Sequence, residues 1–218
     1  MAVTATDTSG NQTTNTYEVD SSGTGATLTY DASGNLTGDG TLTFTWDAEN
    51  GLLSVSIGTK ASEFTYDGLD RRVRILEKDA GVTTSDRHLV WCEFVLCEER
   101  DATGASVTKR FFDEGVQHGG SSYFYSVDHL GSVRELADNG GTVRARYDYD
   151  AWGRRTKVAG EIDADIGFTG HYEHAPSGLT LAQYRAYDAN SGRWISEDPI
   201  GLFGGLDKYT YVDGNPLA

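Results

Sequence analysis

Alternating apolar and polar positions, interrupted at short intervals by turn residues, run along most of the chain. Three segments show the pattern clearly and read TYDASGNL, TWDAENGL and TYDGLDRRV. In each, β-forming residues alternate before an aspartate, and an apolar residue follows the turn. The flanking residues are Leu28, Tyr30 and Leu36, then Phe44, Trp46 and Leu52, then Phe64, Tyr66 and Val73. The pattern predicts successive β-hairpins whose aromatic and aliphatic side chains stack across neighbouring strands.

An aspartate followed three residues later by glycine recurs through the sequence and marks the expected turns. An aspartate at the first turn position accepts backbone N–H bonds, and a glycine at the fourth adopts the left-handed conformation. The positions are Asp7, Asp20, Asp31, Asp101, Asp128, Asp138, Asp150 and Asp198, with variants at Asp47, Asp67 and Asp188. The glycines assigned to these turns include Gly34, Gly131, Gly153 and Gly201.

The densest turn chemistry lies in the run YRAYDANSGRWISEDPIGLFGGLDKYTYVDGNP, residues 184–216. Asp188 opens one turn, Arg193 resumes a strand, and Pro199 supplies the fixed φ of a second turn. Earlier in the chain, longer strands are expected at 87–100 and 105–112. No segment shows a convincing 3.6-residue period with caps. The expected fold class is therefore all-β and antiparallel, with few or no helices.

Composition agrees with a folded, turn-rich chain. Its 218 residues include 27 glycines, 38% are hydrophobic and 11% aromatic, and the mean hydropathy is −0.45. The formal net charge of −15 argues against a nucleic-acid or anionic membrane partner. No apolar run approaches the roughly 18 residues that span a bilayer, and the first residues lack the pattern of a signal peptide. We expect no cofactor and no metal site.

The two cysteines, Cys92 and Cys97, lie in the apolar run HLVWCEFVLC. On one continuous strand, residues five apart point to opposite faces. We therefore expect buried free thiols and no mutual disulfide.

The repeated units, among them YDYDAWGRR, resemble the YD repeat of the RHS/YD-repeat family, which includes Rhs proteins and the C-component shells of Tc toxins. The segment YSVDHLGSVR and the C-terminal run resemble the RHS repeat-associated core of that family. The resemblance implies a β-hairpin ribbon that spirals into a shell wall, which in large relatives closes around a toxin. It divides the chain into a repeat segment, residues 1–124, and a core, residues 125–218. An extracellular or cell-surface location is favoured by the same resemblance.

Family members cleave themselves with two aspartates, one in each of two DPxG turns about twenty residues apart. Asp198 matches the first of them, and the second is expected about three residues beyond Ala218. We interpret Asp198 as a catalytic half-site or, in preference, as a residue that caps its own turn.

Other candidates are given structural interpretations. His171 and His174 match a turn of the family and are expected at the surface rather than as a metal pair. Asp148 and Asp150 are interpreted as solvated strand charges rather than as a calcium site. Seven arginines are interpreted as strand-face partners of acidic residues and not as a phosphate patch. They are Arg71, Arg72, Arg74, Arg144, Arg146, Arg154 and Arg155.

Eight rings are expected to pack between hairpins: Tyr30, Trp46, Tyr66, Tyr147, Tyr149, Trp152, Tyr187 and Trp194. The Thr-rich residues 1–20 carry little that blocks a sheet edge, so we expect them to pair with another copy of the chain.

Three hypotheses of function follow from these observations. The first is a non-enzymatic structural protein that self-assembles into a ring or filament, or forms part of an RHS shell. The second is the processed core of an aspartyl autoprotease. The third is a carbohydrate-binding or cell-surface-binding module that uses Trp152 and Trp194.

Overall fold

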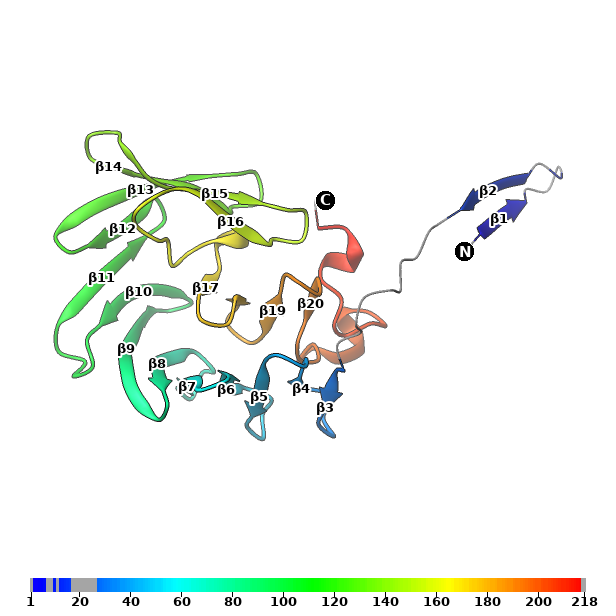
Figure 1. The fold of residues 1–218 in the computed structure, drawn as a ribbon, viewed down its shortest axis with the longest axis horizontal. Helices are drawn as coiled ribbons and strands as arrows, with labels where there is room; N and C mark the ends of the chain where they lie inside the picture. Colours follow the sequence, from blue (N-terminus) through cyan, green and yellow to red (C-terminus); the bar gives the residue numbers. More distant parts are fainter. Residues whose placement is uncertain (1, 7–9, 11, 17–26, 217–218) are drawn as a thin grey trace.

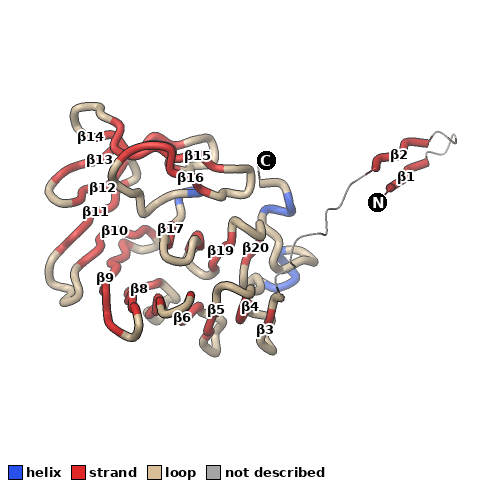
Figure 2. Tube along the Cα trace, viewed as in Figure 1, coloured by secondary structure: helices blue, strands red, loops and turns tan. Residues whose placement is uncertain are grey.

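A computed structural model describes residues 2–6, 10, 12–16 and 27–216 (Figure 1). In these residues the fold is all-β, as predicted, and the helical segments are three short 3₁₀ turns (Figure 2). Fourteen consecutive strands form one antiparallel sheet in chain order. They are β3 (Thr29–Tyr30), β4 (Leu36–Gly38), β5 (Thr43–Trp46), β6 (Leu52–Ile57), β7 (Lys60–Tyr66), β8 (Arg72–Asp79), β9 (Val82–Cys92), β10 (Val95–Arg100), β11 (Val107–Phe112), β12 (Gly115–His118), β13 (Ser121–Val127), β14 (Val133–Asp138), β15 (Val143–Tyr149) and β16 (Arg155–Gly160).

The fourteen-stranded sheet curls into a C-shaped wall (Figure 1). Register shifts occur in most of its strand pairs, for example between Thr65 and Tyr66 and between Ser126 and Val127. Each shift adds a residue to one strand, bends it and increases its twist. The apolar residues that alternate along the strands face the concave side, where Phe64, Ile75 and Leu136 are buried.

The C-terminal quarter of the chain covers the concave face of the wall (Figure 1). It forms a second antiparallel sheet of β17 (Tyr172–His174), β18 (Leu179–Leu181), β19 (Ala186–Asp188) and β20 (Arg193–Trp194), which we call the inner sheet. The 3₁₀ segments η1 (Phe168–Gly170), η2 (Gly201–Gly204) and η3 (Val212–Gly214) flank it. All three residues of β18 are buried, as expected for a strand covered on both faces.

Backbone hydrogen bonds join this segment to strands near both ends of the wall. The Leu36 amide of β4 donates to the Ile195 carbonyl at 2.9 Å, and the Val133 amide of β14 donates to the Gly167 carbonyl at 3.1 Å. One hydrophobic core therefore runs between the wall and the inner sheet.

Seven aspartate turns of the wall share one hydrogen-bond pattern. At Asp128 the carboxylate accepts the amides of Leu130 and Ser132, at 3.0 and 2.9 Å, and the Asp128 carbonyl accepts the Gly131 amide. Gly131 has φ +81°, in the left-handed region. The same pattern of carboxylate bonds recurs at Asp31, Asp47, Asp67, Asp101, Asp138 and Asp150. Asp7 and Asp20 lie outside the described residues.

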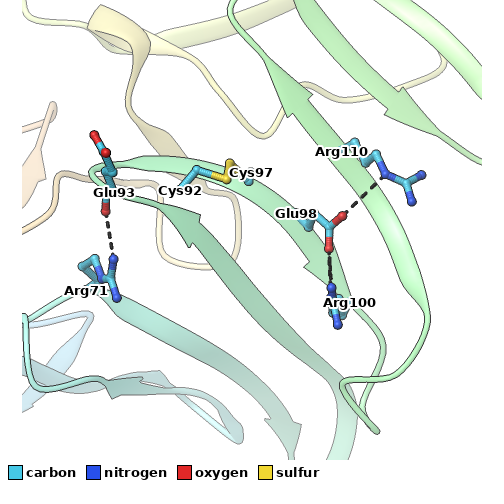
Figure 3. Close-up of a disulfide and its surroundings, with 7 residues drawn as sticks. All are labelled: Arg71, Cys92, Glu93, Cys97, Glu98, Arg100 and Arg110. Carbon is cyan, nitrogen blue, oxygen red and sulfur yellow. Dashed lines mark hydrogen bonds and ion pairs between the residues drawn. A yellow bond between two sulfur atoms is a disulfide. The ribbon is translucent and has the colours of Figure 1, made fainter.

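The cysteine prediction is wrong, as is the expected long strand at 87–100. The chain reverses at Glu93 and Phe94 into a hairpin of β9 and β10, and Glu93 has φ +57°. Cys97 is an extra residue in the ladder between Leu96 and Glu98. The hairpin brings the two Cα atoms to 5.7 Å, and the cysteines form a disulfide (Figure 3). Cys92 is exposed and Cys97 half-buried, so neither is a buried thiol.

Ion pairs surround this disulfide hairpin (Figure 3). Arg71 donates to the Glu93 carbonyl at 2.9 Å, which ties the tip of the hairpin to the turn before β8. Glu98 pairs with Arg100 at 2.7 Å and with Arg110 at 3.5 Å.

Most of the predicted core rings are buried or half-buried. Tyr147 and Tyr187 are each 1% exposed, and Trp46, Tyr66 and Tyr149 pack against the buried clusters. Tyr30 is the exception at 48% exposure, because β3 is an edge strand of only two residues.

Two predictions about chain organisation are not tested by the fold. The division at residues 124 and 125 falls within β13, in the middle of the continuous sheet. In the N-terminal region, β1 (Ala2–Thr6) pairs with β2 (Gln12–Thr16), and residues 17–20 lie outside the described part.

Among the described residues, no helix is long and apolar enough to cross a membrane.

Candidate functional site

Asp198 lies in a tight turn that follows the inner sheet. Its carboxylate accepts the Ile200 amide at 3.0 Å, and its carbonyl accepts the Gly201 amide at 2.8 Å. Gly201 has φ +63°, and Pro199 is exposed at the second turn position. The other carboxylate oxygen lies 3.0 Å from the Arg185 guanidinium. Asp198 thus caps its own turn and also forms an ion pair.

Arg185 links Asp198 to the aromatic core. Its guanidinium lies 4.0 Å from the centroid of the Trp194 ring. Burial lowers the pKa of Arg185, while Asp198 acts against that shift. This arrangement holds one carboxylate in a defined place, and the catalytic role of Asp198 stays a prediction.

The neighbouring turn at Asp188 completes the C-terminal motif. The Asp188 carboxylate accepts the amides of Asn190 and Ser191, and its carbonyl accepts the Gly192 amide. Arg193, the next residue, is exposed and lies 3.6 Å from Asp207.

Aromatic rings from three regions meet beneath these turns. Tyr187 lies 4.5 Å from Tyr211, 5.6 Å from Trp194 and 6.2 Å from Phe168, measured between ring centroids. The Tyr187 hydroxyl donates to the Trp152 carbonyl at 2.7 Å. Trp152 and Trp194 are both half-buried, and the Trp194 ring packs against this cluster.

Gly153 shows why the repeat turn needs glycine where it meets this aromatic cluster. Its φ is +86°, and a Cβ atom there would collide with the Phe168 ring. The same glycine therefore permits both the turn and the packing of η1 against the wall.

A buried polar network joins the wall to the inner sheet. His174 is 1% exposed; its Nε2–H donates to the Glu77 carboxylate at 3.0 Å, and its Nδ1 lies 2.7 Å from the Ser177 hydroxyl. Glu77 also receives Arg87 at 2.8 Å, and Arg87 donates to the Tyr172 hydroxyl at 2.7 Å. β8 and β9 of the wall and β17 of the inner sheet are thus joined by charge-assisted hydrogen bonds.

A second part of this network lies further along the wall. Lys109 of β11 pairs with Asp165 at 2.7 Å and with Glu99 at 3.4 Å. Glu173 accepts the Phe168 amide at 3.0 Å and the Thr180 hydroxyl at 3.1 Å, and burial raises its pKa. The Lys109–Asp165 pair joins residues 56 apart in the sequence, and no local sequence pattern indicated it.

The structure corrects the surface position predicted for His174. The turn at Ala175 and Pro176 is exposed, but the His174 ring points inward and is buried. Among the described residues, no group of three or more His, Cys, Asp or Glu side chains is arranged to hold a metal ion. Asp148 is exposed and pairs with Arg134 at 2.6 Å, whereas Asp150 lies in a turn.

Five of the seven predicted arginines pair with carboxylates. The pairs are Arg71 with Asp67, Arg74 with Asp86, Arg144 with Asp138 and Glu161, Arg146 with Glu135, and Arg154 with Asp150. Arg155 instead lies 4.6 Å over the Tyr147 ring and donates to the Ala164 carbonyl. Arg72 is buried at 3% exposure and pairs with no carboxylate of the described residues, so its predicted role as a strand-face partner of an acidic residue is wrong.

We expect the free energy of unfolding to fall as the pH is lowered from 7.5 to 5.5. Burial lowers the pKa of His174 and of His171 below 6.5, so the unfolded chain binds protons that the folded chain excludes. The stability that these groups contribute is complete above pH 6.5 and is lost below it. Burial raises the pKa of Glu173, which opposes this loss as the pH falls through that raised pKa.

Urea titrations at several pH values measure this slope. The variant His174→Asn should flatten it, and His118→Asn, at an exposed histidine, serves as the control and should leave it unchanged. If the pH dependence of stability is unchanged in His174→Asn, the loss of stability at low pH does not come from His174.

Comparison with known families agrees with this architecture. A model of the Teneurin YD-shell family matches residues 21–208. The chain therefore belongs to the Teneurin YD-shell family, and the predicted resemblance to RHS/YD-repeat proteins is confirmed. The crystal structure of TcdB2-TccC3 has a similar fold, with a TM-score of 0.68 at 18% identity, over 86% of this chain and 11% of that one.

Curated relatives with similar sequences are named as nucleases or as toxins. The tRNA3(Ser)-specific nuclease WapA of Bacillus spizizenii is 30% identical over 203 residues, which are 87% of this chain and 9% of the relative. Double-stranded DNA deaminase toxin A of Burkholderia cenocepacia is 27% identical over 87% of this chain and 16% of its own length. The probable deoxyribonuclease RhsA of Dickeya dadantii is 33% identical over 47% of this chain. The chain spans a small part of the length of each relative.

These relatives overturn the first hypothesis of function in so far as it gives the chain a purely structural, self-assembling role. A purely structural protein that self-assembles is contradicted by relatives named as a tRNA nuclease, a DNA deaminase toxin and a deoxyribonuclease. The structural neighbour TccC3 occurs in a complex with TcdB2, which agrees with a place in a larger shell assembly. The charge-based exclusion of a nucleic-acid contact is not tested.

Proposed function

We propose that the chain acts as part of a bacterial toxin directed at nucleic acid, and that residues 27–216 form a section of the shell wall of that toxin. The observation that carries the proposal is the match of 87% of the chain to relatives named as nucleases and a deaminase toxin. The family match over residues 21–208 supports the assignment of these residues to the shell.

The geometry supports a role as a stable wall section. The turns satisfy their own backbone groups through aspartate, and the inner sheet covers the concave apolar face with a buried polar network. The surface is acidic, with 33 acidic and 18 basic residues, so an adjoining wall of this kind would repel phosphate rather than bind it. A nucleic-acid substrate would then bind in another part of the toxin.

We further propose that the toxin works outside the cell that makes it. Disulfides persist in oxidising environments and are rare in reducing ones. The Cys92–Cys97 disulfide supports such a location.

The test uses the polypeptide encoded by the complete reading frame that contains these 218 residues. The purified polypeptide is incubated with total tRNA and with plasmid DNA, and cleavage is followed on gels and deamination by sequencing. We expect one of these activities in that polypeptide and none in the 218-residue chain alone. A complete polypeptide that leaves tRNA and DNA unaltered would contradict the proposal, whether its reading frame encodes more than these 218 residues or these residues alone.

A further inference from the structure

A cavity of about 440 Å³ lies between the concave face of the wall and the segment that leads into and out of the inner sheet. The wall contributes Leu89, Trp91 and Phe111, and the inner segment contributes Tyr172 and Leu181. This volume is within the range of pockets that hold small ligands, and such pockets combine apolar walls with a few polar groups.

Arg72 supplies the positive charge of this cavity. β8 has a bulge next to Arg72. Arg72 pairs with Tyr66 of β7 and Arg74 pairs with Thr65, so the residue between the two arginines has no partner in β7. The bulge turns Arg74 to the outside, where it pairs with Asp86 at 2.6 Å, and Arg72 to the concave side. Two arginines in one strand therefore have opposite environments.

The Arg72 guanidinium has no charged partner among the described residues, in which no carboxylate oxygen lies within 4.0 Å of it. It lies over the rings of Phe64 and Tyr66, at 5.3 and 5.4 Å, and its one polar contact is the Tyr66 hydroxyl at 3.4 Å. Its Nε has no hydrogen-bond partner in the part of the chain that the structure describes. A cation that is 3% exposed is costly unless an anion compensates it.

Two further polar groups line the same cavity with unused hydrogen-bonding capacity. The Tyr125 hydroxyl and the Gln183 Nε2 are buried and have no partner among the described residues. Burial raises the pKa of Tyr125, so its hydroxyl remains a donor. A buried donor without a partner has lost its hydrogen bond to water, and an acceptor from a ligand replaces that bond.

His171 and Asp113, two other titratable residues of the lining, do not neutralise the Arg72 guanidinium. Burial lowers the pKa of His171, so its ring is neutral near neutral pH. Asp113, the carboxylate of the lining, is exposed at the mouth of the cavity. The interior therefore offers one cation and two donors within apolar walls.

We propose that this cavity binds a carboxylate carried on an apolar body. The single cation suits a monoanion, since a phosphate dianion would leave negative charge uncompensated among aromatic walls. Arg72, Tyr125 and Gln183 donate to the carboxylate, and Trp91 and Phe111 contact the apolar body. The carboxylate belongs either to a free aliphatic or aromatic acid or to an acidic residue between apolar residues of a peptide.

The mouth of the cavity suits such a ligand. Phe94 and Phe112 line it at 71% and 57% exposure, and Phe94 lies at the tip of the disulfide hairpin. These exposed rings give an apolar body a surface to contact as its carboxylate enters.

Isothermal titration calorimetry of the 218-residue chain tests the proposal with 4-phenylbutyrate. We expect saturable binding at one site, and we expect 4-phenylbutyramide, the neutral analogue, to bind ~10- to 100-fold more weakly. Inorganic phosphate should not compete. A blocked tripeptide with glutamate between two leucines, compared with its glutamine form, shows whether a peptide carboxylate is accepted as well as a free acid.

Variants locate the site. Arg72→Met should weaken binding ~10- to 100-fold and leave the melting temperature unchanged or higher, because it removes an unpaired buried cation. Tyr125→Phe should weaken binding and also leave the fold intact. Arg74→Met, on the outer face of the same strand, is the matched control and should bind as the parent chain does.

Each outcome decides for or against the site. Equal affinity for the acid and the amide, competition by phosphate, or unchanged binding in both Arg72→Met and Tyr125→Phe would overturn the proposal. If Arg72→Met fails to fold, Tyr125→Phe and the acid–amide comparison still decide. Absence of binding by both the free acid and the tripeptide would overturn it as well.

Discussion

The substitution Tyr187→Ala is expected to lower the free energy of unfolding by about 3–5 kcal/mol. Tyr187 is 1% exposed and contacts the rings of Phe168, Trp194 and Tyr211. Alanine would leave a cavity where η1, β20 and η3 meet, and it would also remove the hydrogen bond to the Trp152 carbonyl.

Urea denaturation followed by tryptophan fluorescence measures this loss. Tyr184→Ala, at a ring that is 55% exposed, is the matched control and should change stability by no more than about 0.5 kcal/mol. Tyr187→Phe isolates the hydroxyl and should cost about 1 kcal/mol. A loss below about 1 kcal/mol in Tyr187→Ala would show that the aromatic cluster does not hold the inner sheet in place.

A loss of similar size, about 3–5 kcal/mol, is expected for Glu77→Ala. Glu77 accepts from Arg87, His174 and Ser62, and those contacts lower its pKa against the effect of burial. Without this carboxylate, Arg87 retains Glu99 at 4.0 Å, and His174 retains only the Ser177 hydroxyl. The variant therefore leaves buried polar groups unsatisfied at the contact between wall and inner sheet.

Glu63→Ala provides the control for this substitution. Glu63 pairs with Lys78 at 2.6 Å, but its side chain is 45% exposed, and exposed ion pairs contribute about 0–1 kcal/mol. If Glu77→Ala and Glu63→Ala lower the unfolding free energy equally in the same urea titration, the buried network does not stabilise the fold.

The sequence predicted what short-range chemistry determines. An Asp-x-x-Gly turn contains its own donors and acceptors within five residues, as at Asp128, so its recurrence predicts hairpins and an all-β sheet. The hairpin at Glu93 and Phe94 was missed because neither residue is typical of a two-residue turn, and the disulfide was missed with it.

Contacts between distant segments were not predictable from the same reasoning. Glu77 and His174 are 97 residues apart, and their contact depends on how far the wall curls before the inner sheet packs against it. The burial of Arg72 depends on a bulge that shifts the register by one residue and so reverses the face. Residue types alone do not specify the position of such a bulge.

The contact between the segment that follows the inner sheet and the β3–β4 hairpin of the wall affects the order in which the chain folds. Each hairpin of the wall forms from neighbouring residues, but the Tyr209 hydroxyl donates to the Gly34 carbonyl, 175 residues earlier. Contacts of such long sequence separation form slowly, because a long loop must close first. During synthesis strands β3–β16 therefore emerge before the inner sheet that covers them, and their concave apolar face remains open to chaperones or to wrong partners until β17–β20 have been made.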